Sequence, residues 1–376
     1  MRPVQSLLLV SSVVVAACSG NGRADLVLEL EWKRSVYGPT LLESASGLVV
    51  LGQGSGPGLT FSVFAPSDDF LVAPLCEVTL TSGVMTVGVF LSATRAVFSQ
   101  SDLAGIVATD AVVVDLTSGS PPITRSMRLP PGTVPLAADG RWLLSTYLGH
   151  DGQQRFLELI DLDDPSSQFS HPVPGQPGLA IVAQAHMLVF VAGYGWVRVS
   201  PELAAAGQGF EEKASPELTE VFDAIVEGDE VLLASVHDSS SQASQWIRIA
   251  RHELLDGWPQ WPSKKATEFE LPKHNLRFVW DGRGTGVLGG MDYVESVIVC
   301  SGLDSCYVTT TPAYLIEEGD DAFHARPVLL PYLDFGVGSY DGLRGTHTMA
   351  VRGGRLLTFQ GDPYELAWYR IDLSAP

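Results

Sequence analysis

The chain has 376 residues, with 43 Asp and Glu against 23 Lys and Arg, so its formal net charge is −20. A charge of this sign repels polyanions, which excludes nucleic-acid binding through the usual Lys and Arg contacts to phosphate. The 45% share of hydrophobic residues, with 38 Gly and 24 Pro, is typical of a folded, turn-rich protein rather than a disordered one.

The N-terminal segment has the features of an export signal. Arg2 gives it a basic start, and Leu7–Ala17 is almost wholly apolar but too short to span ~30 Å of hydrocarbon. Val15–Cys18 then reads Val-Ala-Ala-Cys, which resembles the lipobox of bacterial lipoproteins position by position. The resemblance implies cleavage before Cys18, lipid on its sulfur, and stable anchoring once a second acyl chain such as palmitate is added.

This reading divides the chain into a signal peptide at 1–17, a lipidated cysteine with a short tether at 18–25, and one folded domain at 26–376. It implies a bacterial cell-envelope protein anchored to the membrane by lipid. Because Ser19 rather than Asp follows the cysteine, the outer membrane is the expected address in a Gram-negative cell. The alternative is an ordinary signal peptide with an incidental cysteine.

The mature chain exceeds the ~250–300 residues that one hydrophobic core usually serves, so it has two domains or grows by repetition. Short apolar runs alternate with turns of the Asp-Gly and Gly-Gly kind, which are hairpin signals. We place the first hairpin turns of successive units near Gly47, Ser101, Gly140, Ala185, Asp229, Gly282 and Gly354. Spacings of about 40–55 residues, except for the longer last interval, predict an all-β fold, a β-propeller with seven blades preferred and six or eight as alternatives.

Ring closure and two irregular stretches complete the expected architecture. We expect a strand at Leu26–Trp32 to join the last blade beside Tyr364–Leu373. Thr311–Tyr340 contains three prolines and is either an insertion or a degenerate extra unit. Ser200–Gly207 predicts a short helix, whereas Ser215–Val226 fits either a helix or a strand that begins at Glu220.

The run from Gly105 to Gly119 resembles the strand-turn-strand of bacterial propellers with quinoprotein-like or YVTN-like repeats. That resemblance covers about one unit well and the other units loosely. It supports the propeller and indicates no particular activity.

The cysteines suggest one disulfide. Cys300 and Cys306 flank a five-residue loop between two β-like runs, a geometry that brings facing residues within bridging distance. In an oxidising compartment we expect this pair to be bridged. Cys76 is expected to be a buried small hydrophobe.

The sequence gives little sign of catalytic or metal chemistry. The histidines form no zinc-binding spacing. The pairs His150-Asp151 and His237-Asp238 are read as polar loop residues that could form a site only if they shared one face. No cofactor is expected, with calcium at Asp161–Asp164 or Glu317–Asp321 as an alternative. Gly284–Gly289 matches a dinucleotide fingerprint but precedes a β-like run, so a glycine-rich hairpin is favoured.

Trp258 and Trp261 stand three residues apart on a Pro-containing connector. Two indoles so placed are a candidate stacking platform for a sugar ring or a protein, or else they close the edge of the core. We therefore predict a non-catalytic binding or scaffold module for an envelope protein or glycan. The alternative is a propeller enzyme, carbohydrate-active or quinoprotein-like, with its site at the channel mouth.

Overall fold

The computed structural model describes 28–371 apart from 36–40, 46–47, 55–58, 65–73, 81–84, 102–106, 118–122, 151, 205, 216–219, 239–243, 273–275, 291–294, 301–304, 332–348, 353 and 362–363. The expected signal peptide, Cys18 and the tether therefore lie outside the described residues. None of the helices in the described part is long and apolar enough to cross a lipid bilayer.

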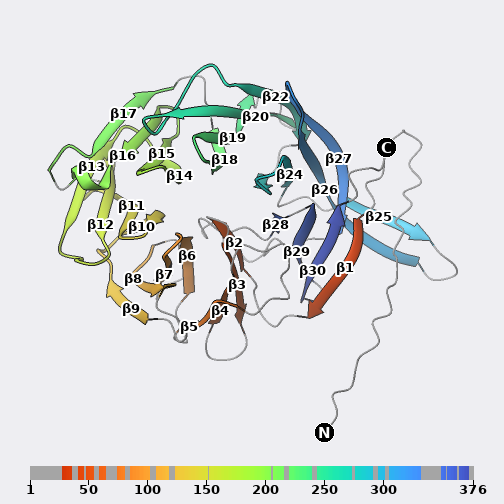
Figure 1. The fold of residues 1–376 in the computed structure, drawn as a ribbon, viewed down its shortest axis with the longest axis horizontal. Coiled ribbons are helices and arrows are strands. Elements are labelled where there is room, and N and C mark those ends of the chain that lie inside the picture. The colour runs from red at the N-terminus through yellow and green to blue at the C-terminus, as the bar shows by residue number, and fades with distance from the viewer. Residues whose placement is uncertain are drawn as a thin grey trace, which may run out of the picture.

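Within the described residues, thirty strands form seven antiparallel sheets arranged around one axis (Figure 1). Each sheet is one blade of a β-propeller, and we name its strands A to D from the axis outward. The innermost strands contact one another in a closed circuit of β2, β6, β10, β14, β18, β23 and β28. The all-β propeller is thus confirmed, and the number of sheets agrees with the seven blades expected.

The blades follow the chain in order. Blade 1 contains β2 (Leu41–Ala45), β3 (Leu48–Gly54), β4 (Leu59–Phe64) and β5 (Cys76–Leu80), and blade 2 contains β6 (Met85–Leu91), β7 (Arg95–Ser101), β8 (Asp110–Asp115) and β9 (Ile123–Arg128). Blade 3 contains β10 (Val134–Asp139), β11 (Trp142–Leu148), β12 (Arg155–Asp161) and β13 (Gln168–Val173), and blade 4 contains β14 (Pro177–Ala183), β15 (His186–Val191), β16 (Gly195–Val199) and β17 (Phe210–Ala214), with helix α1 (Pro201–Ala204) before β17.

Blades 5 and 6 each have a fifth strand, and blade 7 takes one strand from the N-terminal part of the chain. Blade 5 contains β18 (Glu220–Glu227), β19 (Glu230–Asp238), β20 (Ser244–Leu255) and β22 (Lys265–Pro272), with β21 (Trp258–Pro259) on the end of β20. Blade 6 contains β23 (Leu276–Trp280), β24 (Thr285–Gly290), β26 (Ser305–Glu318) and β27 (Phe323–Pro331), with β25 (Glu295–Cys300) on β26. Blade 7 contains β28 (Met349–Arg352), β29 (Arg355–Gly361), β30 (Tyr364–Ile371) and β1 (Leu28–Ser35).

The ring closes as expected from the sequence. β1 is the outermost strand of blade 7 and pairs antiparallel with β30, from Leu28 opposite Ile371 to Ser35 opposite Glu365. Both ends of the described chain therefore lie in one blade. The pairing ties the two ends of the ring through backbone hydrogen bonds and also covers the open edge of β30.

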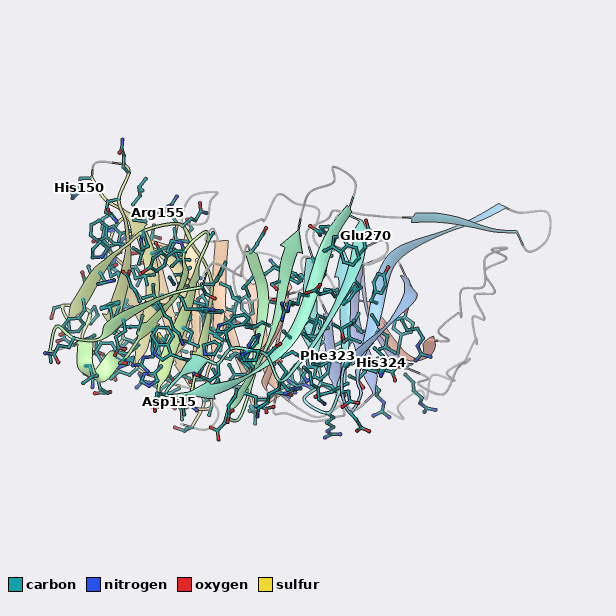
Figure 2. All side chains as sticks on the ribbon, turned by 90° about the horizontal axis from the view of Figure 1, so that it is seen from above. Asp115, His150, Arg155, Glu270, Phe323 and His324 are labelled. Carbon is teal, nitrogen blue, oxygen red and sulfur yellow. The ribbon has the colours of Figure 1, made fainter. Side chains whose placement is uncertain are left out.

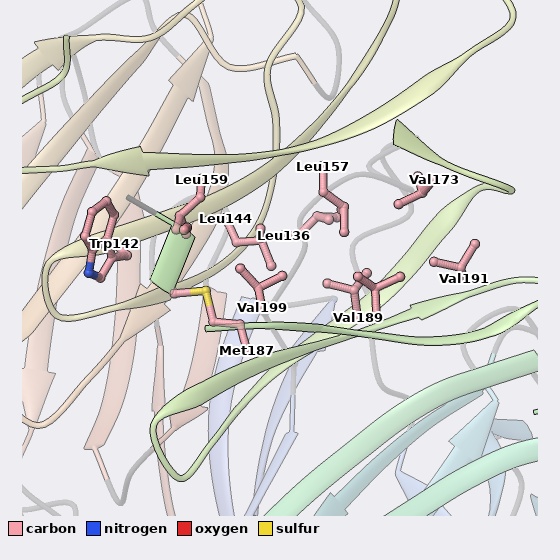
Figure 3. Close-up of a cluster of buried hydrophobic side chains, with 12 residues drawn as sticks. Leu136, Trp142, Leu144, Leu157, Leu159, Val173, Met187, Val189, Val191 and Val199 are labelled. Carbon is pink, nitrogen blue, oxygen red and sulfur yellow. The ribbon is translucent and has the colours of Figure 1, made fainter. Parts of the chain in front are cut away.

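Apolar side chains of neighbouring blades interlock instead of filling one central core. Leu144, Leu157 and Leu159 of blade 3 pack against Met187 and Val189 of blade 4, and all five are fully buried (Figure 3). Alternate residues of each strand point toward the blade on one side and the blade on the other. A single strand such as β12 therefore contributes side chains to two junctions between blades. A long chain can then be stable without a single large interior.

The structure corrects two of the sequence expectations and confirms two others. The first turn of blade 2 is not at Ser101, which ends β7, but at Ser92–Thr94, where a serine side chain replaces the Gly signal. The irregular stretch expected from Thr311 is regular strand up to Pro331, because β26 and β27 form the outer part of blade 6. Glu220 begins a strand, so the strand alternative is correct, and α1 lies within the expected helix.

The ring has two faces that the strand order defines. A–B and C–D connections lie on one face, called the A–B face, and B–C connections lie on the other, called the B–C face. Figure 2 shows Asp115 and Phe323 toward the first face and His150 and Arg155 toward the second. This division decides which predicted site residues share a surface.

Candidate binding site

The candidate site is built around a hairpin that extends blade 5 on the A–B face. β20 runs on past the start of its partner β22 and turns back at Asp256 and Gly257, so that Leu255 pairs with Trp258. Both turn residues have positive φ, 51° and 73°. An Asp-Gly pair suits this two-residue turn because both residues tolerate the left-handed conformation.

Blade 4 holds the turn in place. The Gly257 N–H donates to Gln184 Oε1 over 3.1 Å, and the Arg198 guanidinium donates to the Asp256 carbonyl. The His186 ring lies so close that a Cβ on Gly257 would come within 2.5 Å of His186 Cδ2. Gly257 is therefore required by both its backbone conformation and the lack of space.

His186 links the turn to helix α1. Its Nδ1 lies 2.9 Å from Ser200 Oγ, and the backbone carbonyl of Ser200 accepts the first hydrogen bonds of α1. Burial, and then the charge of Arg198, lower the pKa of His186. A neutral imidazole is thus favoured at this junction, which suits packing against Gly257.

Trp258 lies partly exposed beside two cations of blade 4. The guanidinium carbon of Arg198 is 5.1 Å from the centroid of its ring, and Lys213 Nζ is 5.7 Å away. Arg198 also pairs with Glu211 over 2.7 Å. These cation–π contacts fix the ring orientation and leave an aromatic edge with positive charge next to it.

Trp261 is partly buried, like Trp258, and packs against a histidine of the same blade. Its ring meets the His252 ring edge-on at 4.2 Å, and His252 Nδ1 lies 2.9 Å from the Gln260 carbonyl. Both indoles pack against the apolar cluster between blades 4 and 5. The structure therefore brings the two predicted residues to one rim, where a platform for a ligand stays a prediction.

Sequence reasoning missed the residues that shape this rim. Arg198 and Lys213 come from blade 4, and Leu255 is 59% exposed at the hairpin. Asp256-Gly257 between Leu255 and Trp258 is itself a hairpin signal that could have located the turn. The cations could not be assigned to Trp258 without knowing which blades are neighbours.

The predicted calcium ligands are engaged in ion pairs. Asp161 pairs with Arg141, which lowers the pKa of Asp161 through a direct hydrogen bond, and Asp163 pairs with Arg95 at 3.1 Å and Arg125 at 2.9 Å. In the second stretch, Glu318 binds Arg251 and Lys265. Among the described residues, no group of His, Cys, Asp and Glu side chains could hold a metal ion.

His150 and the pair His237-Asp238 lie toward the same B–C face, but in blades 3 and 5, with blade 4 between them. His150 is exposed in the β11–β12 connection of blade 3, and His237 belongs to β19 of blade 5. Asp151 and the side chain of His237 lie outside the described residues. The Asp161–Asp164 stretch follows β12 on the A–B face, so the structure does not bring it together with His150.

Two of the three cysteines beyond Cys18 occupy the β25–β26 hairpin. Cys300 lies opposite Ser305 and Cys306 opposite Val299, so the two cysteines are not the directly facing pair that the sequence led us to expect. Their side chains are outside what the structure describes, and the bridge itself stays a prediction. Cys76 is a buried free thiol, as expected, and burial raises its pKa. Gly286 and Gly289 lie in strand β24, which confirms a hairpin rather than a dinucleotide site.

No protein-family model matches the chain, and no curated protein matches it. Among solved structures, BamB from Moraxella catarrhalis is similar over 92% of this chain and 98% of its own, with 10% identity and a TM-score of 0.40. The propeller domain of the Trilobed protease from Pyrococcus furiosus covers 74% and 79%, with 13% identity and a TM-score of 0.38. BBS1N in complex with ARL6DN covers 93% and 99%, with 10% identity and a TM-score of 0.42. We transfer no function at these values, and the fold assignment rests on the strand topology.

Proposed function

We propose that this protein is a lipid-anchored component of a bacterial cell envelope whose propeller acts as a non-catalytic binding or scaffold module. The partner is an envelope protein or a glycan, and it docks on the A–B face beside Trp258. The observation that carries the proposal is the hairpin at Asp256-Gly257, which blade 4 holds rigidly from three side chains. A pre-organised surface loses little entropy on binding.

The composition of this rim also supports binding. Trp258 presents an aromatic edge beside Lys213, and Leu255 is largely exposed although it is apolar. Aromatic anchors next to flexible polar groups are common in recognition surfaces. An exposed leucine on a rigid turn adds an apolar contact that gives the folded chain itself no stability.

The anchor proposal is supported by the sequence at Val15–Cys18. Cys18→Ala removes the sulfur that would carry lipid, so the variant should move from the membrane fraction to the soluble fraction. Fractionation with a salt wash measures this, because a salt wash releases proteins held by charge alone. Membrane retention of Cys18→Ala after the wash would contradict the anchor.

The binding proposal is tested by Trp258→Ala, with Trp246→Ala as the matched control. Trp246 is 42% exposed on β20, whose other end leads into the hairpin with Trp258, and it lies toward the B–C face. We expect Trp258→Ala to reduce retention of envelope ligands in pull-downs and glycan-array binding, and Trp246→Ala to leave both unchanged. Equal binding by Trp258→Ala, Trp261→Ala and the unmodified protein would refute the platform.

A further inference from the structure

Two exposed leucines lie at the junction of blades 4 and 5, on the A–B face. Leu203 on α1 is 49% exposed, and Leu255 beside the hairpin turn is 59% exposed. The Ser200–His186 contact and the packing of His186 against Gly257 connect α1 to the hairpin. We call these two side chains the leucine rim.

The charges around the leucine rim are mainly negative. Glu202, Glu253 and Asp256 are exposed next to the two leucines in sequence. Within the described part of the chain no direct salt bridge joins them to a cation, although the charge of Glu202 acts on Arg141 and that of Glu253 on Lys264. Lys213 is the exposed cation beside Trp258.

Basic groups on both sides of blade 5 are already neutralised. Arg198 pairs with Glu211, Arg251 binds Glu227 and Glu318, and Lys264 binds Glu230 over 2.6 Å. An approaching ligand therefore meets apolar side chains bordered by exposed carboxylates that no described cation contacts directly. The whole chain has a formal charge of −20, which strengthens attraction to a basic ligand and repels a second copy.

We propose that the leucine rim binds a segment of a partner protein that combines aliphatic and basic side chains. This rests on the proposed binding function and narrows its partner to a protein. Aliphatic side chains of the partner would cover Leu203 and Leu255, and Lys or Arg would meet Glu202, Glu253 and Asp256. A glycan fits less well, because sugar hydroxyls can donate hydrogen bonds to the carboxylates but do not neutralise their charge, and they offer no aliphatic cover for the leucines.

The test uses short synthetic peptides of one length, titrated against the purified propeller by fluorescence anisotropy. One peptide alternates Lys with Leu, one alternates Lys with Ser, and one alternates Glu with Leu. We expect the Lys-Leu peptide to bind tightest and the Glu-Leu peptide not to bind. Added salt should weaken the Lys-Leu complex without abolishing it, since only part of the attraction is electrostatic.

Variants distinguish peptide binding at the leucine rim from a general attraction of basic peptides to an acidic protein. The double variant Leu203→Ser, Leu255→Ser should weaken the Lys-Leu peptide by about tenfold and the Lys-Ser peptide little. Leu148→Ser is the matched control, because Leu148 is 47% exposed on the B–C face. All three positions are at the surface, and circular dichroism should show unchanged folding.

Three outcomes would overturn the inference. Equal peptide binding by the double variant and the unmodified protein would show that the leucines are not contacted, and equal loss with Leu148→Ser would show that the effect is not local. Glycan binding that Trp258→Ala removes, without leucine-dependent peptide binding, would also overturn it and would leave the proposed binding function intact. If neither glycan nor peptide binds at this rim, the proposed function fails as well.

Discussion

A single substitution at Glu158 should show how a buried carboxyl group at a junction between two blades makes the free energy of unfolding depend on pH. Glu158 lies on strand C of blade 3, on the side that faces blade 2, and it is 6% exposed. One carboxyl oxygen has no hydrogen-bond partner among the described residues, and Ser99 across the junction also has an unpaired hydroxyl. Burial raises the pKa of Glu158, and a hydrogen bond from Ser145 offsets only part of that effect.

The direction of the pH effect follows from proton linkage. An unfolded glutamate loses its proton near pH ~4.3, whereas the folded carboxyl keeps it to a higher pH. Between the two pKa values the folded state binds more protons, so the free energy of unfolding falls as pH rises, by up to ~1.4 kcal/mol per pH unit. The loss stops above the raised folded pKa of Glu158, where both states are ionised.

Glu158→Gln removes this titration while keeping the side-chain shape. Relative to the unmodified protein, the variant should gain stability as pH rises from about 4.3 and reach a constant advantage once the pH exceeds the raised folded pKa of Glu158. Urea unfolding followed at a series of pH values measures the difference, and other groups cancel because both proteins carry them. Glu220→Gln is the control, since Glu220 is exposed at the start of β18. A Glu158→Gln difference that does not change with pH would refute the reasoning.

Three further outcomes test other parts of the structure. Arg251→Met should lower the free energy of unfolding by about 3 kcal/mol in urea titration, because three glutamates lose a buried cation, whereas the exposed Arg128→Met should have little effect. Gly257→Ala should lower the thermal midpoint and expose the hairpin to protease, since both φ and space exclude a side chain, and a neutral result would contradict the turn geometry. Thiol titration of the denatured Cys18→Ala variant should find one thiol if Cys300 and Cys306 are bridged, whereas three would disprove the bridge.

The sequence predicted the blades where turn chemistry was explicit. Gly140 and Gly228 have positive φ at first hairpin turns, and only residues of this kind make such turns easily. The turn of blade 2 was missed because Ser92 Oγ accepts hydrogen bonds from the Arg95 N–H at 3.1 Å and the Thr94 N–H at 3.4 Å. A serine turn of this type has a weak sequence signal, which is why the predicted turn fell at Ser101 instead.

The candidate site was only half predictable. Trp258 and Trp261 stood out because two indoles on a short connector are rare. The residues around them could not be predicted from the sequence. The contact of Arg198 with the Asp256 carbonyl joins residues 58 positions apart and depends on which blades are neighbours. Alternation along a strand tells which residues share a face, but it does not tell which blade they meet.

The scarcity of cations connects the fold to the docking surface. The junctions between blades consume them, with Arg95 reaching Asp163 in blade 3, Arg198 reaching the blade 5 turn, and Arg251 reaching Glu318 in blade 6. In a ring of separate sheets, ion pairs and hydrogen bonds hold neighbouring blades together at the rims, where apolar packing ends. The chain has 23 basic and 43 acidic residues. Because arginines are engaged in contacts between blades, many surface carboxylates have no basic side chain to pair with. The negative border of the leucine rim is thus a consequence of how neighbouring blades are held together, and a partner that supplies the missing cations would complete it.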